Sequence, residues 1–338
     1  MRVRRATSRR SSRLLDRLLH AVLDRPPAMP RRRLRLEALE PRHLLAVTLQ
    51  PIDDQTVLAG APLHLLLSGT SDLGNPLTYT VQVSNASLEN PNLFDPQLSA
   101  VIPLDNPGLR IVVSSPGNEI AGTMTFQLFA DLVPQTVARI TTLVDQGFYD
   151  GLIFHRVIND FMIQGGDPEG DGTGGSGLTF DDEFRAELQF TTPGLLAMAN
   201  SGDDTNDSQF FITVAPTRWL DFDHTIFGFL TSGQSILEQI EQVATGENDR
   251  PLHDVVMTSV SLLSDDPNGV LRLAVPHGTT GTAEVTVTAT DPLTSESASV
   301  SFLVTVAADQ NNNRPFLESL EPLVTAAGVP LAFQVPAF

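Results

Sequence analysis

Alternating apolar and polar residues predict half-buried β-strands in two separate parts of the chain. Between residues 49 and 100, the segments "APLHLLLSG" and "LTYTVQVSN" are separated by the turn-forming sequence "TSDLGNP". The same alternating pattern returns after residue 268, in "GTAEVTVTATDP" and "ASVSFLVTVAAD". Neither part shows a long helical period, so we expect antiparallel strands in both.

The middle of the chain mixes strand-like runs with two helical patterns. Apolar residues recur at helical spacing within residues 133–148 and again within 232–247. Pro134 suits the first turn of the earlier helix, and Gly147 suits its C-terminal cap. Short runs such as "LRIVVSS", "GTMTFQLFA" and "QFFITVA" read as strands. The pattern predicts a mostly β fold, in which a closed or nearly closed barrel is capped by two helices.

Charge and cysteine content narrow the range of functions. The net charge is −19, yet residues 1–45 contain 13 Arg and four acidic residues, and no Lys occurs in the chain. The remaining residues are so acidic that they would repel nucleic acid and anionic lipid, so neither is expected as a partner. No segment approaches the ~20 apolar residues of a membrane span. Without Cys, disulfides and thiolate nucleophiles are excluded.

The basic segment 1–46 is expected to be an arm that directs targeting. Its end, "LRLEALEPRHLLA" (34–46), resembles a short signature found on exported and cell-surface proteins of planctomycete bacteria. The resemblance implies an extracytoplasmic location, in the periplasm, at the cell surface or secreted. Nucleic-acid binding by the arm is the competing interpretation.

A series of motifs between residues 109 and 264 resembles the cyclophilin family of peptidyl-prolyl cis-trans isomerases. The motifs are "GTMTFQLFADLVPQTVARI", "GFYDGLIFHRVINDFMIQGGDPEGDGTGGSG", "FDDEF" and "GLLAMANSGDDTNDSQFFITVAPTRWLDFDHTIFGFL", in that order. The resemblance implies an eight-stranded barrel, assigned to residues 106–265, with a helix across each end. It also implies rotation of Xaa–Pro bonds in polypeptides, without a cofactor.

The resemblance assigns site residues position by position. Arg156 matches the donor that meets the proline nitrogen, Gln164 the amide that contacts peptide backbone and helps hold the arginine, and His224 the histidine of the proline pocket. Trp219 implies sensitivity to cyclosporin-like ligands, and His155 is interpreted as structural. Taken alone, most of these residues would be ordinary core or surface positions. The expected substrate-binding residues are Phe161, Met162, Gly172, Ala199, Asn200, Gln209, Phe211, Trp219 and Leu220.

Two positions depart from the family pattern. Asp207 stands where the family usually has Gly, and Ser201 replaces a common Ala. Both flank the expected groove, so they could change substrate preference, towards peptides with basic residues, or the shape of a loop. The glycine-rich "GGDPEGDGTGGSG" lacks the lysine of a phosphate loop. The acidic "FDDEF" lacks further ligands at metal spacing, so no metal site is expected.

The flanks 47–105 and 266–308 each have too few strands for a sandwich but together have enough. We therefore expect one immunoglobulin-like or cadherin-like β-sandwich, split by insertion of the barrel; two separate β units are the alternative.

Residues 309–338 are expected to be a linker and the start of a second, incomplete β module. There "LEPLVTAAGVPLAFQV" echoes "LQPIDDQTVLAGAPLHLLL", as in a truncated chain or a tail that pairs elsewhere. "DQNNNRP" (309–315) is similar to a cadherin calcium linker, although a merely polar linker is the simpler interpretation.

Two functions remain open at this point. One is an active prolyl isomerase that assists protein folding outside the cytoplasm. The other is an adhesion or scaffold protein in which the barrel only binds proline-containing peptides. The arginine favours the first, since a pure binder has no need of the donor.

Overall fold

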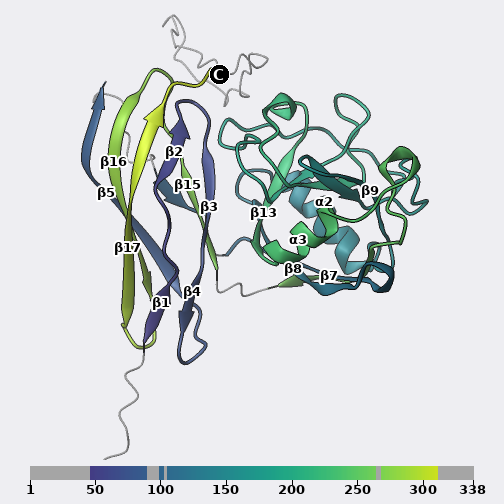
Figure 1. Ribbon diagram of the computed structural model, residues 1–338, viewed down its shortest axis with the longest axis horizontal. Helices are drawn as coiled ribbons and strands as arrows, with labels where there is room; N and C mark the ends of the chain where they lie inside the picture. Colours follow the sequence, from purple (N-terminus) through teal and green to yellow (C-terminus); the bar gives the residue numbers. More distant parts are fainter. Residues whose placement is uncertain (1–45, 90–98, 103–104, 264–267, 311–338) are drawn as a thin grey trace, which may run out of the picture. The chain divides into compact units, whose positions relative to one another are not determined.

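The computed structural model describes residues 46–89, 99–102, 105–263 and 268–310 (Figure 1). The basic arm, the linker sequence after Gln310 and the repeated segment that follows it lie outside these ranges, and their expected roles stay predictions. All described residues belong to one compact unit. Within the described ranges, no helix combines the length and apolar character that a membrane crossing requires.

Eight antiparallel strands from the middle of the chain form one curled sheet, in the order β14-β7-β8-β13-β11-β12-β10-β9. A bridge between Ile153 and Val256, just before β9 and at the start of β14, brings the two outer strands together. The mostly β, eight-stranded fold expected from the sequence is thereby confirmed. The strands are β7 (Gly108–Ser115), β8 (Ile120–Leu128), β9 (Phe154–Ile158), β10 (Met162–Gly165), β11 (Leu195–Met198), β12 (Phe210–Thr213), β13 (Ile226–Ser232) and β14 (Val256–Leu263).

Two helices pack against this sheet (Figure 1). The first, α2 (Pro134–Asp145), begins at Pro134, and Gly147 follows its end with a positive φ of 67°, as the sequence predicted. The second, α3 (Gln234–Glu241), ends earlier than predicted. Gly233 precedes α3 with a φ of 93°, and a Cβ atom there would lie 2.4 Å from the Thr123 carbonyl oxygen. Only glycine fits this turn.

The barrel has a continuous apolar core. All residues of β11 and β12 are buried, which explains why, apart from Thr213, their sequences are apolar runs rather than alternating ones. Each fully buried phenylalanine contributes about 1.5–3 kcal/mol of hydrophobic stabilisation. The phenylalanines without exposed surface are Phe126, Phe129, Phe154, Phe190 and Phe227.

The flanking segments form their own sheets, and each of the two larger ones takes strands from both sides of the barrel in sequence. A four-stranded sheet has the order β2-β17-β16-β5, and a three-stranded sheet has the order β3-β15-β6. The strands are β1 (Val47–Leu49), β2 (Gln55–Leu58), β3 (Leu63–Leu67), β4 (Gly69–Ser71), β5 (Thr78–Glu89), β6 (Ser99–Val101), β15 (Gly269–Leu273), β16 (Thr280–Thr290) and β17 (Ser297–Ala307). β1 pairs with β4.

Alternation predicted half-buried strands in this region, and the burial confirms it. Val285 and Val287 of β16 and Val304 and Val306 of β17 are buried, while the residues between them are more exposed. With Leu67 and residues of β15 they form a second apolar core, distinct from that of the barrel.

Candidate active site

Four neighbouring strands of the barrel place an arginine, an amide and an aromatic ring in one row. Arg156 of β9 is the cross-strand partner of Gln164 of β10, and Gln164 is in turn the partner of Phe211 of β12. Phe211 also faces Ala197 of β11. Directly opposed residues on adjacent antiparallel strands have Cβ atoms ~4.5–5.5 Å apart. The strand register therefore brings together side chains that are distant in sequence.

An apolar patch continues this row. Met162 and Phe211 are buried, and Phe161 and Leu220 are partly buried against the same core. The exposed ring of Trp219 lies over Phe161, with centroids 5.6 Å apart. Trp219 and Leu220 are carried by the single-turn helix η4 (Arg218–Leu220). The structure thus gathers the residues that the sequence assigned to a proline pocket.

His224 stands edge-on to this patch, with its ring centroid 5.4 Å from that of Phe211 and the planes at 90°. Its Nδ1 lies 2.9 Å from the carbonyl oxygen of Met198, which can only accept, so Nδ1 carries the proton. Burial lowers the pKa of His224 below its ordinary value, although the bond to Met198 opposes that shift. His224 is therefore neutral at pH 7.

Gln164 and Gln209 form a short amide chain beside the arginine. Nε2 of Gln164 donates to Oε1 of Gln209 at 2.9 Å, and Gln209 donates to the carbonyl oxygens of Gly172 and Gly174 at 3.1 and 2.8 Å. The amide of Gln164 was expected to help hold Arg156; its hydrogen bond instead anchors the glycine-rich loop through Gln209. Gly172 itself has a φ of 91°, so backbone conformation requires glycine there.

A groove of about 390 Å³ runs past this amide chain. Among the residues that line it are Ala199, Asn200, Gly172 and Gln209, all of them expected from the sequence. Nδ2 of Asn200 donates to the carbonyl oxygen of Asp223 at 2.7 Å, which fixes the orientation of this side chain. The groove and the apolar patch meet at Gln164 and Phe211, since these two residues are paired across β10 and β12.

Asp207 shapes a loop rather than offering an unengaged charge to a substrate. Its carboxylate accepts hydrogen bonds from the backbone N–H groups of Ser176 and Gly177, at 2.9 and 3.1 Å, and from the hydroxyl of Ser176. Arg139 of α2 also donates to that hydroxyl, at 2.6 Å. Of the two roles that the sequence left open for Asp207, loop shape is the one these contacts favour.

Asp249 was not anticipated from the sequence. Its Oδ2 lies 3.4 Å from Nε of Arg156, in an ion pair whose side chains are 40% (Arg156) and 47% (Asp249) exposed. Asn248 and Asp249 both have positive φ angles, 58° and 61°, a conformation that Asn and Asp tolerate better than other non-glycine residues. Arg250 fastens the same loop by donating to the carbonyl oxygen of Gly170 at 2.8 Å. The composition "GENDRP" predicts a turn, but nothing in it indicates which residue the turn faces.

Asp167 was also missed, and it supports the glycine-rich loop from within. It is buried, and it accepts the backbone N–H groups of Glu169, Asp171 and Gly172 at 2.9, 3.0 and 2.6 Å. His155 is buried nearby, and burial lowers its pKa. Neither ring nitrogen of His155 has a hydrogen-bond partner within the described ranges, and the structural role expected for it stays a prediction.

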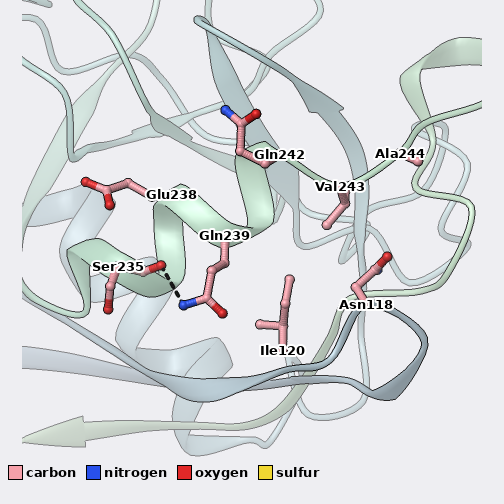
Figure 2. Close-up of a pocket in the computed structure, with 8 residues that line it drawn as sticks. All are labelled: Asn118, Ile120, Ser235, Glu238, Gln239, Gln242, Val243 and Ala244. Atoms are coloured by element: carbon pink, nitrogen blue, oxygen red, sulfur yellow. Dashed lines mark hydrogen bonds between the residues drawn. The ribbon is translucent and has the colours of Figure 1, made fainter.

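A separate pocket of about 470 Å³ lies beside α3 (Figure 2). The dashed line in Figure 2 joins the amide nitrogen of Gln239 to the carbonyl oxygen of Ser235, at 3.0 Å, a bond within the helix. Glu238 is the one ionisable residue among those that line the pocket. The pocket shares no residue with the row of Arg156 and Gln164, and we do not assign it to the active site.

Comparison with known proteins finds similar chains. Residues 111–262 match the family model described as cyclophilin type peptidyl-prolyl cis-trans isomerase/CLD. The peptidyl-prolyl cis-trans isomerase-like 1 of Neurospora crassa is 46% identical over 148 residues, which cover 43% of this chain and 91% of the relative. The isomerase ppi1 of Schizosaccharomyces pombe is 47% identical over 145 residues, covering 42% and 94%. A solved cyclophilin-type isomerase of Cryptosporidium parvum has 34% identity and a TM-score of 0.44, covering 47% and 98%.

Proposed function

The chain belongs to the cyclophilin-type family of peptidyl-prolyl cis-trans isomerases, and we propose that Arg156, Gln164 and the adjoining apolar patch are its catalytic centre. The observation that carries this proposal is the strand register, which sets Arg156 beside Gln164 and Gln164 beside Phe211. A fixed cation thereby lies next to an apolar surface that fits a proline ring.

The reaction requires no covalent chemistry. Amide resonance gives the Xaa–Pro bond partial double-bond character, which raises a rotation barrier of ~18–20 kcal/mol. In the twisted transition state the nitrogen is pyramidal and regains its lone pair. A site that binds the twisted amide more tightly than the planar one lowers the barrier. About 7 kcal/mol of such differential binding corresponds to an acceleration of roughly 10⁵.

Arg156 supplies the donor for that nitrogen. A guanidinium group stays protonated at any working pH and presents its N–H groups as a rigid fork. Donation to the lone pair is strong only when the amide is twisted, because resonance withdraws the lone pair from the planar amide. The interaction is therefore selective for the transition state, as catalysis requires.

The surrounding residues hold the peptide while the bond turns. Phe161, Met162, Phe211 and Leu220 pack against the ring, and neutral His224 closes the pocket without introducing a charge. Gln164 and Asn200 provide amide groups for the backbone of the peptide in the groove. The substrates are proline-containing polypeptides, and the chemical role is assistance of their folding.

The test compares the wild type with Arg156→Ala in an NMR exchange assay on an Xaa–Pro peptide. We expect a loss of at least about a hundredfold in kcat/KM, the range seen when a transition-state donor is removed. Binding of the same peptide should change much less. Equal exchange rates for both proteins would refute the catalytic role and favour the alternative, a module that only binds proline peptides in a cell-surface scaffold.

The flanking segments, we further propose, form an immunoglobulin-like or cadherin-like sandwich that is interrupted by the barrel and works outside the cytoplasm. Strand pairing between the two flanks supports the sandwich, and the signature in residues 34–46 supports export. Fractionation of cells that express the full chain tests location. Recovery of the protein in the cytoplasm alone would rule out export.

A further inference from the structure

A buried ionic network lies behind the turn that carries Trp219 and Leu220. Arg218, the first residue of η4, has a side chain only 12% exposed. Its Nε donates to Oδ2 of Asp221 at 2.5 Å, and its Nη2 donates to Oε1 of Gln189 at 2.8 Å. The other oxygen of Asp221 accepts the backbone N–H of Phe190 at 2.6 Å. Arg218 and Asp221 thus lock the two ends of the turn to each other and to residues 189–190.

One partner of Arg218 comes from outside the barrel. Nη2 of Arg218 also donates to Oδ2 of Asp309 at 3.1 Å, and the side chain of Asp309 is 8% exposed. Asp309 follows β17, beyond residues 111–262 that match the family model. Asp309 is also the first residue of the segment 309–315, which resembles a cadherin calcium linker. In this structure its carboxylate binds Arg218.

Two more contacts reach the same place from the flanking segments. Nε2 of Gln189 donates to the carbonyl oxygen of Gly60 at 2.8 Å. The hydroxyl of Thr191 donates to the carbonyl oxygen of Pro62 at 2.5 Å. The support of the turn therefore includes residues from before and after the barrel in sequence.

We infer that Arg218 is a positioning residue for the proline pocket and that Asp309 extends this role to the flanking β-structure. The inference rests on the proposed function, because it concerns the same pocket. The guanidinium of Arg218 is nearly buried, so its charge must be balanced by hydrogen-bond acceptors. Because Asp221 and Asp309 supply these carboxylates, their positions determine the position of the turn. Trp219 and Leu220 lie between these two ends, so the same contacts fix the position of Trp219 over Phe161.

The chain offers a probe for this turn, since Trp219 is its single tryptophan. Intrinsic fluorescence therefore reports on the rim of the pocket, whether or not the enzyme is active. In the full chain, Asp309→Ala should shift the emission of Trp219. It should also raise KM for a proline peptide by about three- to tenfold, the size expected for one lost interaction near the site, with kcat within about twofold. Arg218→Gln should give a larger effect of the same kind.

Asp53→Ala is the matched control, because it removes an exposed carboxylate from the same flanking segments. It should change neither emission nor KM. Wild-type emission and KM in Asp309→Ala would overturn the inference for Asp309, and the same result in Arg218→Gln would overturn it altogether. If the wild type lacks isomerase activity, the proposed function fails, yet the emission of Trp219 still decides whether Asp309 positions the turn.

Discussion

Nε of Arg156 lies 3.4 Å from Oδ2 of Asp249, which is 93 residues further along the chain. An ion pair this exposed adds little to stability, at most about 1 kcal/mol. The ion pair instead fixes the orientation of the Arg156 guanidinium. With Nε engaged by Asp249, the donors left for the nitrogen of a twisted amide are those on the two terminal nitrogens of the guanidinium.

We expect Asp249→Ala to lower kcat about three- to tenfold, because the guanidinium loses the contact that orients it. The midpoint of thermal unfolding should change by no more than about 2 °C, as expected for an exposed pair. Asp249→Asn keeps an acceptor oxygen and should recover part of the loss. Asp145→Ala, at an exposed position of α2, is the control. A normal kcat in Asp249→Ala would show that Arg156 needs no such orientation.

The pH profile should be flat around neutrality. Burial lowers the pKa of His155 and of His224 below the ordinary value of a histidine, so the neutral form of both predominates at pH 7 and above. A guanidinium group stays protonated at any working pH. We expect kcat/KM from NMR exchange to vary by less than about twofold between pH 7 and 9, with any decline on the acid side only. A titration near pH 7 that disappears in His224→Gln would contradict the assignment of a neutral histidine.

His64 should make the protein sensitive to acid. It is buried on β3, with its ring stacked 5.5 Å from that of Phe129 and opposite Arg272 of β15. Burial, assisted by the charge of Arg272, lowers its pKa from 6.5 to about 3. Below pH ~6.5, His64 binds a proton in the unfolded chain but stays neutral in the folded chain. The contribution of neutral His64 to the free energy of unfolding is therefore complete above this pH and is lost towards pH 3.

Each pH unit in this window should cost up to ~1.4 kcal/mol of the free energy of unfolding. Urea denaturation of the wild type and His64→Phe at pH 7, 6, 5 and 4 measures the difference. The variant keeps an aromatic ring and lacks the titrating group, so its stability should fall less steeply. Parallel curves would show that His64 is protonated in the folded protein.

Cyclosporin-like ligands should bind across the proline pocket and change the emission of Trp219, a residue that is 64% exposed and whose ring lies over Phe161. Trp219→Ala should weaken binding at least about tenfold in calorimetry, as expected when an exposed aromatic anchor is lost. Calorimetry of the wild type that shows no heat of binding, together with unchanged fluorescence, would exclude this ligand class.

The sequence predicts best those parts of the site whose residues lie close together in the chain. Arg156 and Gln164 belong to adjacent strands joined by a short turn, so a single motif carries both. Phe211 and His224 come from a second motif, and the barrel fold unites the two. Helix α2 was predictable because proline and glycine fix its ends through backbone conformation alone.

Long-range polar contacts were not predictable in the same way. Asp249 reaches Arg156, and Asp309 reaches Arg218, across about 90 residues each. An aspartate in a turn has the same local signature whether it faces solvent or a guanidinium. Asp207 was predictable in part. Its departure from the family pattern marks it in the sequence, but its role depends on the position of Ser176, which only the structure shows.

The pairing of β5 with β16 has a consequence for the newly synthesised chain. Val83 faces Val285, so β5 leaves the ribosome about 200 residues before its partner. At ~5–20 residues per second, this strand waits roughly 10–40 s with an unpaired edge, while the whole barrel is made and becomes free to fold. The isomerase is thus complete before the sheets that flank it can close, and it is the first part of the described chain able to act.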